Sequence, residues 1–376
     1  MLLGFFSFHT NRNSVMIKYT QTLILLLCCS LVAQAQTQWF NPAEAKTAVI
    51  HGQALSNEIA PAYTRLPQRA QADVTPALWN LAQQAAGLSL QFQTNAPKIT
   101  IKYIVTGNLA MPHMPTTGVS GLDLYAINRK GTWRREIANG YHFGDTCSFT
   151  FYTHRKGYTA NQTLDYALLL PLYNGVKFLE VGIPEHSSLE WIPQPTEKPI
   201  VIYGTSIAQG ACASRPGMAW GNILARKLNK PIINWGFSGN GKLETGMLNF
   251  VSEVDAALYI LDCLPNLAKE PYLADLSKRI TDAVMLLRSK HTAPIILVDH
   301  ASGSFDEGNY HTKKANKISK ETYKALRAAG VKNLHYLSYK DINLAEDALV
   351  DYVHPSDYGM EQIATAYAKK IRKILK

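Results

Sequence analysis

The sequence has few cysteines, and none of them stands at a spacing typical of a metal site. It contains 5 cysteines. Cys28 and Cys29 lie in an N-terminal apolar run, and Cys147, Cys212 and Cys263 are far apart along the chain. This distribution excludes a zinc-finger pattern and the disulfide framework of a small secreted domain. We expect free buried thiols, although an oxidising compartment would allow one bridge between Cys212 and Cys263.

Other absences narrow the class of protein further. The sequence has no internal repeat, no low-complexity tract and no anchoring motif, so it gives no support to a cell-surface scaffold. Residues 204–210 begin and end with glycine, but Ala211 and Cys212 follow where a phosphate-binding loop needs Lys and then Ser or Thr. Beyond the N-terminus, we find no stretch that is apolar over enough residues to span a membrane.

The N-terminal apolar run is typical of a secretory signal peptide. A short basic start at 16–19 precedes an apolar segment at 23–32, and residues 33–35 read Ala-Gln-Ala, a small-residue cleavage site. We expect residues 1–35 to be removed, with Met16 as an alternative start. The mature protein would then be secreted or periplasmic.

The chain is basic, but its positive charge is not concentrated. The formal net charge is +10, and it falls to +8 without residues 1–35, which carry Arg12 and Lys18 and no acidic residue. The densest basic group, within 313–327, falls at helical spacings. This pattern predicts a solvated helix face rather than a track for phosphates, so we expect no nucleic-acid partner.

Up to about Trp191, the mature sequence is dominated by short segments rich in β-branched and aromatic residues, separated by Gly, Asn and Pro. This pattern predicts an N-terminal β-sandwich, jelly-roll-like, over residues 36–192, interrupted by a helix at 76–86. The predicted strands are 98–105, 122–127, 147–153, 164–172 and 176–181.

The pattern changes after residues 193–199, which contain three prolines and predict a stiff linker. Over residues 200–376, short apolar runs alternate with amphipathic segments. This alternation predicts an α/β domain with a parallel sheet and helices on both faces. The predicted strands are 200–203, 232–234, 257–261, 295–298 and 334–337, and the predicted helices are 218–228, 273–289, 313–329 and 357–375.

A serine stands where the first strand of the α/β domain meets the following helix. The apolar run 200–203 leads into Gly204, Thr205 and Ser206. Ligands bind at this carboxyl edge of open α/β sheets, and the unsatisfied N–H groups of a helix start favour negative charge. Taken alone, the segment also fits a turn whose Ser only caps the helix.

An Asp and a His three residues apart precede the last predicted helix. In a turn, the carboxylate of Asp351 can reach Nδ1 of His354 and leave Nε2 free to face a serine. The pair also fits a loop His beside a helix-capping Asp. His300, after the fourth strand, is a competing base, but no acid follows it at a comparable spacing.

Candidate hydrogen-bond donors follow the second and third strands. Segment 234–241 contains three glycines, whose backbone N–H groups can approach a substrate closely, and Asn266 follows the third strand. Each feature alone fits an ordinary turn. Together with the serine and the Asp–His pair, they supply the nucleophile, base, orienting acid and oxyanion donors that acyl transfer requires.

These blocks resemble the GDSL/SGNH hydrolase family over about residues 199–376. The Ser, Gly, Asn and His that give the family its name match Ser206, Gly239, Asn266 and His354, and Asp351 matches the acid of the last block. The resemblance implies a flavodoxin-like domain in which Ser206 is the nucleophile, His354 the base and Asp351 its orienting acid. It also implies an oxyanion hole formed by the N–H groups of Ser206 and Gly239 and the amide of Asn266. The sequence departs from the motif at one position before the nucleophile, where Thr replaces Asp, and at one after it, where Ile replaces Leu.

The preceding domain is similar to the N-terminal Gly-x-Asp-Leu-Tyr β module of a two-domain bacterial subgroup, because residues 121–125 read Gly-Leu-Asp-Leu-Tyr. Arg215, on the loop after the nucleophile, is a candidate substrate-binding residue, with a surface guanidinium as the alternative. His113 and Met114 are candidates for a lid over the site, with a hairpin tip packed on its own domain as the alternative. We expect Asp123 and Tyr125 to be structural.

The resemblance implies a serine esterase that needs no metal and no organic cofactor. Because related two-domain proteins are associated with glycan breakdown, we expect a carbohydrate O-acetylesterase whose substrate is an acetylated carbohydrate or another small ester. The alternatives are a lipid or aryl ester hydrolase and a glycan-binding protein whose hydrolase domain is inactive. The complete set of five site residues argues against the last alternative.

Overall fold

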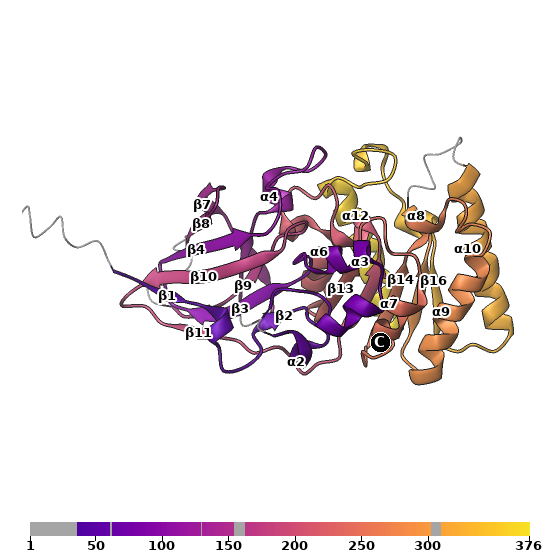
Figure 1. Ribbon diagram of the computed structural model, residues 1–376, viewed down its shortest axis with the longest axis horizontal. Helices are drawn as coiled ribbons and strands as arrows, with labels where there is room; N and C mark the ends of the chain where they lie inside the picture. The colour runs from indigo at the N-terminus through magenta and orange to yellow at the C-terminus, as the bar shows by residue number, and fades with distance from the viewer. Residues whose placement is uncertain (1–35, 61, 129, 154–161, 302–309) are drawn as a thin grey trace, which may run out of the picture.

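The computed structural model describes residues 36–60, 62–128, 130–153, 162–301 and 310–376. The predicted signal peptide, residues 1–35, lies outside these ranges. Within them, no helix is both long enough and apolar enough to cross a bilayer. Figure 1 shows an N-terminal β domain beside a C-terminal domain in which helices surround a sheet.

The N-terminal domain is a sandwich of two antiparallel sheets. The first sheet has the order β1 (Thr37–Phe40), β10 (Val176–Pro184), β4 (Lys98–Val105), β8 (Cys147–Tyr152) and β7 (Ala138–His142). The second has the order β11 (Leu189–Trp191), β3 (Ser89–Thr94), β9 (Leu164–Leu169), β5 (Asp123–Ile127) and β6 (Trp133–Glu136), and β2 (Ile50–His51) also pairs with β3. Short helices α2 (Ser56–Ile59), α3 (Pro76–Ala82) and α4 (Thr116–Val119) lie in its connections. The predicted sandwich is therefore observed.

Alternation of side chains along the strands builds the core of this sandwich. In β8, Cys147, Phe149 and Phe151 are buried, whereas Tyr152 at the end of the strand is exposed. The buried set packs against residues of both sheets in one apolar cluster. This is the pattern of a sheet with one face in the core and one in solvent.

The C-terminal domain has a parallel sheet with the order β13 (Ile232–Gly236), β12 (Ile200–Gly204), β14 (Leu258–Asp262), β15 (Ile295–Val298) and β16 (Leu334–Leu337). The first strand in the chain, β12, lies between β13 and β14, so the chain reverses its direction of winding there. This is the flavodoxin-like order, and the reversal creates a crevice at the carboxyl ends of the strands. Because Gly204 is in register with both Gly236 and Asp262, strands β13, β12 and β14 end at the same level.

The helices cover both faces of this sheet, as the alternation of strand and helix predicts. They are α5 (Ser206–Gln209), α6 (Trp220–Leu228), α7 (Thr245–Val251), α8 (Leu264–Leu267), α9 (Leu276–Lys290), α10 (Tyr310–Ala328), α11 (Tyr339–Ile342) and α12 (Asp357–Ile374). Val201 and Tyr203 pack in the same cluster as α7 and α9, whereas Ile200 and Ile202 pack with α6 and α12. Burial on both faces explains why β12 is an uninterrupted apolar run.

The two domains share apolar packing. Leu66 and Leu78 of the N-terminal domain belong to the cluster that contains α7 and α9. Met114 and Tyr173 of the same domain belong to the cluster that contains α6 and α12. Buried apolar side chains of the N-terminal domain thus complete the two apolar clusters of the α/β domain. The two domains therefore share a packed interface.

Candidate active site

Ser206 is the first residue of helix α5, directly beyond the carboxyl end of β12. Its side chain is nearly buried, with 6% of the residue exposed. The short helix ends at Gly210, whose φ of 109° places it in the left-handed region that glycine adopts at low cost. Thr205, which stands in place of the motif's Asp, is fully buried, and its hydroxyl has no hydrogen-bond partner among the described residues.

A hydrogen-bonded chain joins Asp351, His354 and Ser206. Oδ2 of Asp351 lies 2.8 Å from Nδ1 of His354, and Nε2 of His354 lies 2.8 Å from Oγ of Ser206. A carboxylate can only accept, so Nδ1 carries the proton and Nε2 presents its lone pair to the serine hydroxyl. This geometry orients His354 to take the proton of Ser206.

The loop before α12 is folded so that its acid points at its own histidine. Oδ1 of Asp351 accepts from the backbone N–H groups of Val353 and His354, each at 2.7 Å. The N–H of Val350 donates to the carbonyl of His354 at 2.8 Å, which closes the loop. Burial alone would raise the pKa of Asp351. The hydrogen bonds from the ring and backbone of His354 and from Val353 outweigh burial and hold this pKa below its ordinary value.

Two backbone N–H groups beside Ser206 are available to bind an oxyanion. Those of Ser206 and Gly239 make no hydrogen bond within the described part of the chain. Gly239 has a φ of +69°, and a Cβ there would meet no atom within 4 Å, so the backbone conformation rather than lack of space selects glycine. At Gly241, by contrast, a Cβ would lie 2.1 Å from the carbonyl oxygen of Gly204, so this glycine allows the turn to pack on the end of β12.

The side-chain amide of Asn266 is held by the same glycine-rich turn. We assign the amide orientation that satisfies its neighbours, in which the oxygen accepts from the backbone N–H groups of Asn240 and Gly241, each at 3.1 Å. The amide NH₂ is thereby left to donate elsewhere. Asn266 follows β14, Gly239 follows β13 and Ser206 follows β12, so the common register of these strands brings the three groups to one crevice.

Residues of the N-terminal domain support this turn, and no local pattern in the sequence pointed to them. Arg65 is fully buried and donates from Nη1 to the carbonyls of Gly236 (2.6 Å) and Asn234 (3.3 Å). Burial lowers the pKa of this arginine to about 9. Gln209 accepts from the N–H of Ser238 at 3.0 Å and donates to Gln84 of the N-terminal domain. The turn that carries Gly239 is therefore fixed from both domains.

His113 and Met114 occupy a tight turn of the N-terminal domain that reaches the catalytic loop. Met114 is 3% exposed and packs in a cluster that contains residues of both domains, among them Val119 of its own domain and those of α6 and α12. The ring of His113 lies 5.9 Å from that of His354, centroid to centroid. This position agrees with a wall of the site contributed by the sandwich.

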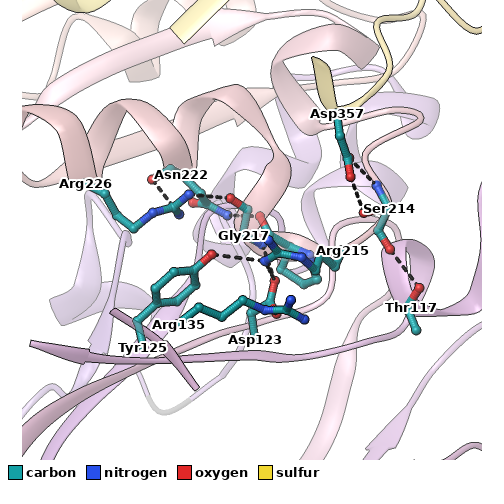
Figure 2. Close-up of polar contacts among 11 residues, drawn as sticks. Thr117, Asp123, Tyr125, Arg135, Ser214, Arg215, Gly217, Asn222, Arg226 and Asp357 are labelled. Carbon is teal, nitrogen blue, oxygen red and sulfur yellow. Dashed lines mark hydrogen bonds and ion pairs between the residues drawn. The ribbon is translucent and has the colours of Figure 1, made fainter. Parts of the chain in front are cut away.

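The side chain of Arg215 binds residues of the N-terminal domain rather than the Ser206 hydroxyl. Its Nη1 donates to Oδ2 of Asp123 at 2.7 Å and to the hydroxyl of Tyr125 at 3.0 Å (Figure 2). The same Oδ2 accepts from the backbone N–H of Gly217 at 2.7 Å. Burial opposes the charge of Arg215, but Asp123 and Tyr125 stabilise it and leave its pKa raised. The Asp and Tyr of the Gly-x-Asp-Leu-Tyr motif thus bind the loop that follows the nucleophile.

That loop is also bonded to the start of the last helix. The N–H and hydroxyl of Ser214 donate to the carboxylate of Asp357 at 2.8 and 2.5 Å, and Thr117 of the N-terminal domain donates to the carbonyl of Ser214 at 2.7 Å (Figure 2). Since Asp357 begins α12, three residues after His354, these bonds connect the N-terminal domain to the segment that carries the base.

His300, the competing base, does not contact Ser206 in the structure, and the three cysteines outside the N-terminal run are not bridged. His300 is 3% exposed, and its backbone N–H donates to Asn316, whereas the imidazole in contact with Ser206 is that of His354. Cys147, Cys212 and Cys263 are free and buried, as expected.

One group of side chains has the atoms of a metal site. Cys212, Asp351 and His354 each place a potential ligand atom within 4.8 Å of the others. Burial, together with the charge of Asp351, raises the pKa of the Cys212 thiol to about 11. The other two members already bond each other, so the group fits a hydrogen-bonded pair beside a buried thiol better than a metal centre.

Comparisons with known proteins agree with this arrangement. The sequence model of the GDSL-like lipase/acylhydrolase family matches residues 197–372, and the GxDLY model, described as the N-terminus of Esterase_SGNH_hydro-type proteins, matches residues 37–189. The crystal structure of a GDSL-like lipase from Bacteroides ovatus has 31% sequence identity and a TM-score of 0.80, and the match covers 90% of this chain and 98% of that one.

Two more distant structures share the fold. The salicylyl-acyltransferase of a tetracycline biosynthetic pathway has 19% identity and a TM-score of 0.69, with 91% of this chain and 98% of that one covered. A family two carbohydrate esterase from Cellvibrio japonicus has 13% identity and a TM-score of 0.56, with coverages of 90% and 98%. No protein with curated information matches the sequence.

Proposed function

This chain belongs to the GDSL-like lipase/acylhydrolase family, and from that premise we propose that it is a carbohydrate O-acetylesterase that works through an acyl-enzyme intermediate. The observation that carries the proposal is the hydrogen-bonded chain from Asp351 through His354 to Ser206, in which both distances are 2.8 Å. The backbone N–H groups of Ser206 and Gly239, assigned here to the oxyanion hole, make no hydrogen bond among the residues that the structure describes. An intact nucleophile of this kind opposes the alternative of a binding protein with an inactive hydrolase domain.

In the proposed first half-reaction, Oγ of Ser206 attacks the ester carbonyl carbon while Nε2 of His354 takes the hydroxyl proton. Asp351 holds the imidazole in the correct tautomer and stabilises the imidazolium. The negative charge on the carbonyl oxygen is received by the N–H groups of Ser206 and Gly239 and by the NH₂ of Asn266. The C–O bond then breaks, His354 donates its proton to the departing sugar oxygen, which leaves as a hydroxyl group, and the acyl group remains on Ser206.

In the second half-reaction, water takes the place of the sugar. His354 removes a proton from water, the hydroxide oxygen attacks the acyl carbon, and the oxyanion is bound by the same donors. Collapse of this intermediate releases the carboxylic acid and returns the proton to Ser206. These steps use only the side chains and backbone groups named above.

The choice of an acetylated carbohydrate as substrate rests on the two-domain arrangement. The carbohydrate esterase from Cellvibrio japonicus has the same fold along 98% of its length. In this chain, the sandwich contributes His113 to the wall of the site and binds the loop after the nucleophile through Asp123. A site walled by two domains suits a bulky alcohol portion better than a long acyl chain alone.

A second candidate is an aryl or lipid ester, and exposed apolar groups near the base favour it. Val350 and Tyr352, on either side of Asp351, are 53% and 85% exposed. Apolar surface of this kind at a site mouth is able to contact an aromatic or aliphatic acyl group.

The deciding experiment compares the two classes of substrate. Acetate release is measured from a panel of acetylated polysaccharides, and kcat/KM is measured for p-nitrophenyl esters of increasing acyl length. The proposal predicts acetate release from at least one polysaccharide and a decline in kcat/KM beyond the acetyl ester. A rise in kcat/KM with acyl length, with no acetate released from any polysaccharide, would establish the second candidate instead. Ser206→Ala is the inactive control for both assays.

We further propose that the protein is exported and acts outside the cytoplasm, because residues 1–35 have the pattern of a cleaved signal peptide. N-terminal sequencing of the mature protein should begin at Gln36. A mature protein that retains residues 16–35 in the cytoplasmic fraction would contradict this proposal.

A further inference from the structure

A cavity of about 240 Å³ lies between the sandwich and the loop after the nucleophile, where the proposed mechanism has no use for it. It opens beside β6 and β7, the edge strands of the two sheets. Thr117 and Ser214, whose mutual hydrogen bond joins the two domains, also line it. The cavity therefore borders the same loop that is bonded to the start of α12.

One wall of the cavity is aromatic. Tyr141, on edge strand β7, is 59% exposed, which is unusual for so large a ring. One face of its ring stacks on Phe149, with centroids 5.4 Å apart and planes 23° apart. Phe149 is 3% exposed and belongs to the core of the sandwich, so it holds Tyr141 in place. A fixed, exposed aromatic ring offers an apolar platform for the C–H face of a sugar.

A second wall is cationic. The carboxylate of Asp123 is 3% exposed and accepts from Nη1 of Arg215, from the N–H of Gly217 and from Nε of Arg135. Figure 2 shows both guanidinium groups close to this single carboxylate. Two unit positive charges thus share one negative charge, and a net positive charge remains at the cavity.

The two arginines keep donors that are not used within the described residues. Arg135 bonds only through Nε, and Arg215 only through Nη1, although each guanidinium has five N–H donors. Their side chains are 39% and 20% exposed. Planar guanidinium groups with free N–H pairs match a planar carboxylate, to which they donate two parallel hydrogen bonds.

A cavity with an apolar platform and guanidinium groups that can bind a carboxylate is suited to a ligand that combines a sugar ring with a carboxylate. The volume lies below the range of roughly 300–1,000 Å³ that is typical of sites for drug-sized ligands, so the occupant is one ring rather than several. We propose that this cavity binds a uronic-acid residue of the polysaccharide whose ester the enzyme cleaves. This inference rests on the proposed function, because it takes the substrate to be a glycan.

The position of the cavity determines what the binding would do. It borders the loop after Ser206 but does not include Ser206, His354 or Asn266. Binding there would hold an acidic polymer near the crevice without changing the reacting groups. The expected consequence is a lower KM for acetylated polysaccharides that contain uronic acid, at an unchanged kcat.

The test measures binding directly, with Ser206→Ala protein so that no turnover occurs. Isothermal titration calorimetry compares a linear trisaccharide of galacturonic acid with the galactose trisaccharide of the same linkage. We expect the acidic trisaccharide to bind at least tenfold more tightly. Adding Arg135→Gln should remove this preference, and adding Tyr141→Ala should weaken binding of both trisaccharides at least fivefold.

Matched controls come from outside the cavity. Tyr152→Ala removes an exposed ring at the end of β8, and Lys98→Ala removes an exposed cation at the start of β4. Neither substitution should change the binding. Melting temperatures of all variants identify any loss of fold, and Tyr141→Ala remains informative if Arg135→Gln is unstable.

Equal binding of the two trisaccharides, or wild-type affinity in both Arg135→Gln and Tyr141→Ala, would overturn the inference. So would tight binding of a sulfated galactose trisaccharide when the uronic acid does not bind. Acetate release, measured in parallel with Ser206 intact, separates this inference from the proposed function. Deacetylation without uronate binding refutes the cavity's role alone, whereas uronate binding without any deacetylation refutes the proposed reaction and leaves the cavity's ligand established.

Discussion

Asn266 provides a sharp prediction, because its amide oxygen and its NH₂ have different roles in the proposed site. Its oxygen accepts from the N–H groups of Asn240 and Gly241, each at 3.1 Å, and its NH₂ is left for the substrate oxyanion. Asn266→Asp keeps the shape and the acceptor, so the turn should remain intact. It removes the donor and places a negative charge where the oxyanion forms. Asn266→Ala removes the donor without adding the charge.

The two substitutions should therefore lower the rate by different amounts. Loss of one oxyanion donor costs about 10²–10³ in kcat, or about 2.7–4 kcal/mol. Two unit charges about 3 Å apart repel by roughly 5 kcal/mol at an effective dielectric constant of about 20. Asn266→Asp should therefore lower kcat by at least a further tenfold beyond Asn266→Ala, with less loss of stability than the alanine variant shows.

The assay is steady-state hydrolysis of p-nitrophenyl acetate, together with thermal unfolding of each variant. Asn249→Asp, on the exposed surface of α7, adds the same charge away from the crevice and should leave kcat unchanged. If Asn266→Asp retains kcat within a few-fold of wild type, the amide does not bind the oxyanion, and the geometry assigned to it is wrong.

Three further predictions concern buried groups. Asp123→Ala leaves the guanidinium of Arg215, 20% exposed, without its carboxylate and should lower the unfolding free energy by about 3–5 kcal/mol in urea titrations. The double variant Asp123→Ala/Arg215→Ala should lose less unfolding free energy than the sum of the losses in the two single variants. Burial raises the pKa of Asp262 to about 6 despite the hydrogen bond from Tyr367. The native state therefore binds this proton more tightly than the unfolded chain does. As a result, the wild-type stability falls as the pH rises from about 4 to 6. Asp262→Asn should therefore raise the melting temperature more at pH 8 than at pH 4, and an equal change at both would contradict this pKa. Arg65→Met removes the donors to four carbonyls, of which those of Asn234 and Gly236 are buried, and should destabilise the protein by at least about 3 kcal/mol. An unchanged urea midpoint would show that these bonds contribute nothing net.

The sequence predicted the parts of the structure that depend on local pattern. The five parallel strands and the four long helices of the α/β domain lie within a few residues of their predicted bounds, because apolar runs and helical periodicity reflect burial directly. Ser206, Gly239 and Asn266 could be placed together because parallel strands end at one edge of a sheet. In the sandwich, the sequence predicted β4, β5, β8, β9 and β10, because these strands are rich in β-branched and aromatic residues bounded by Gly, Asn and Pro.

What the sequence could not predict depends on contacts between distant residues. Strands such as β6 and β7 are short, polar edge strands whose pairing is set by tertiary packing rather than by local propensity. Arg65 carries no local signal, because an arginine is ordinarily exposed, and only the packed interface shows that it binds the carbonyls of the glycine-rich turn. Arg215 was placed on the correct loop, but its partner Asp123 lies 92 residues away in the other domain.

The central claim is that Ser206 is a nucleophile activated by His354. The most direct test treats the protein with a fluorophosphonate probe and locates the adduct by mass spectrometry of the digested protein, in wild type and in His354→Ala. We predict one modified peptide, containing Ser206, in the wild type and a loss of at least 100-fold in its labelling rate in the variant. A wild-type adduct on another residue with Ser206 unmodified, or equal labelling rates in the two proteins, would contradict the account.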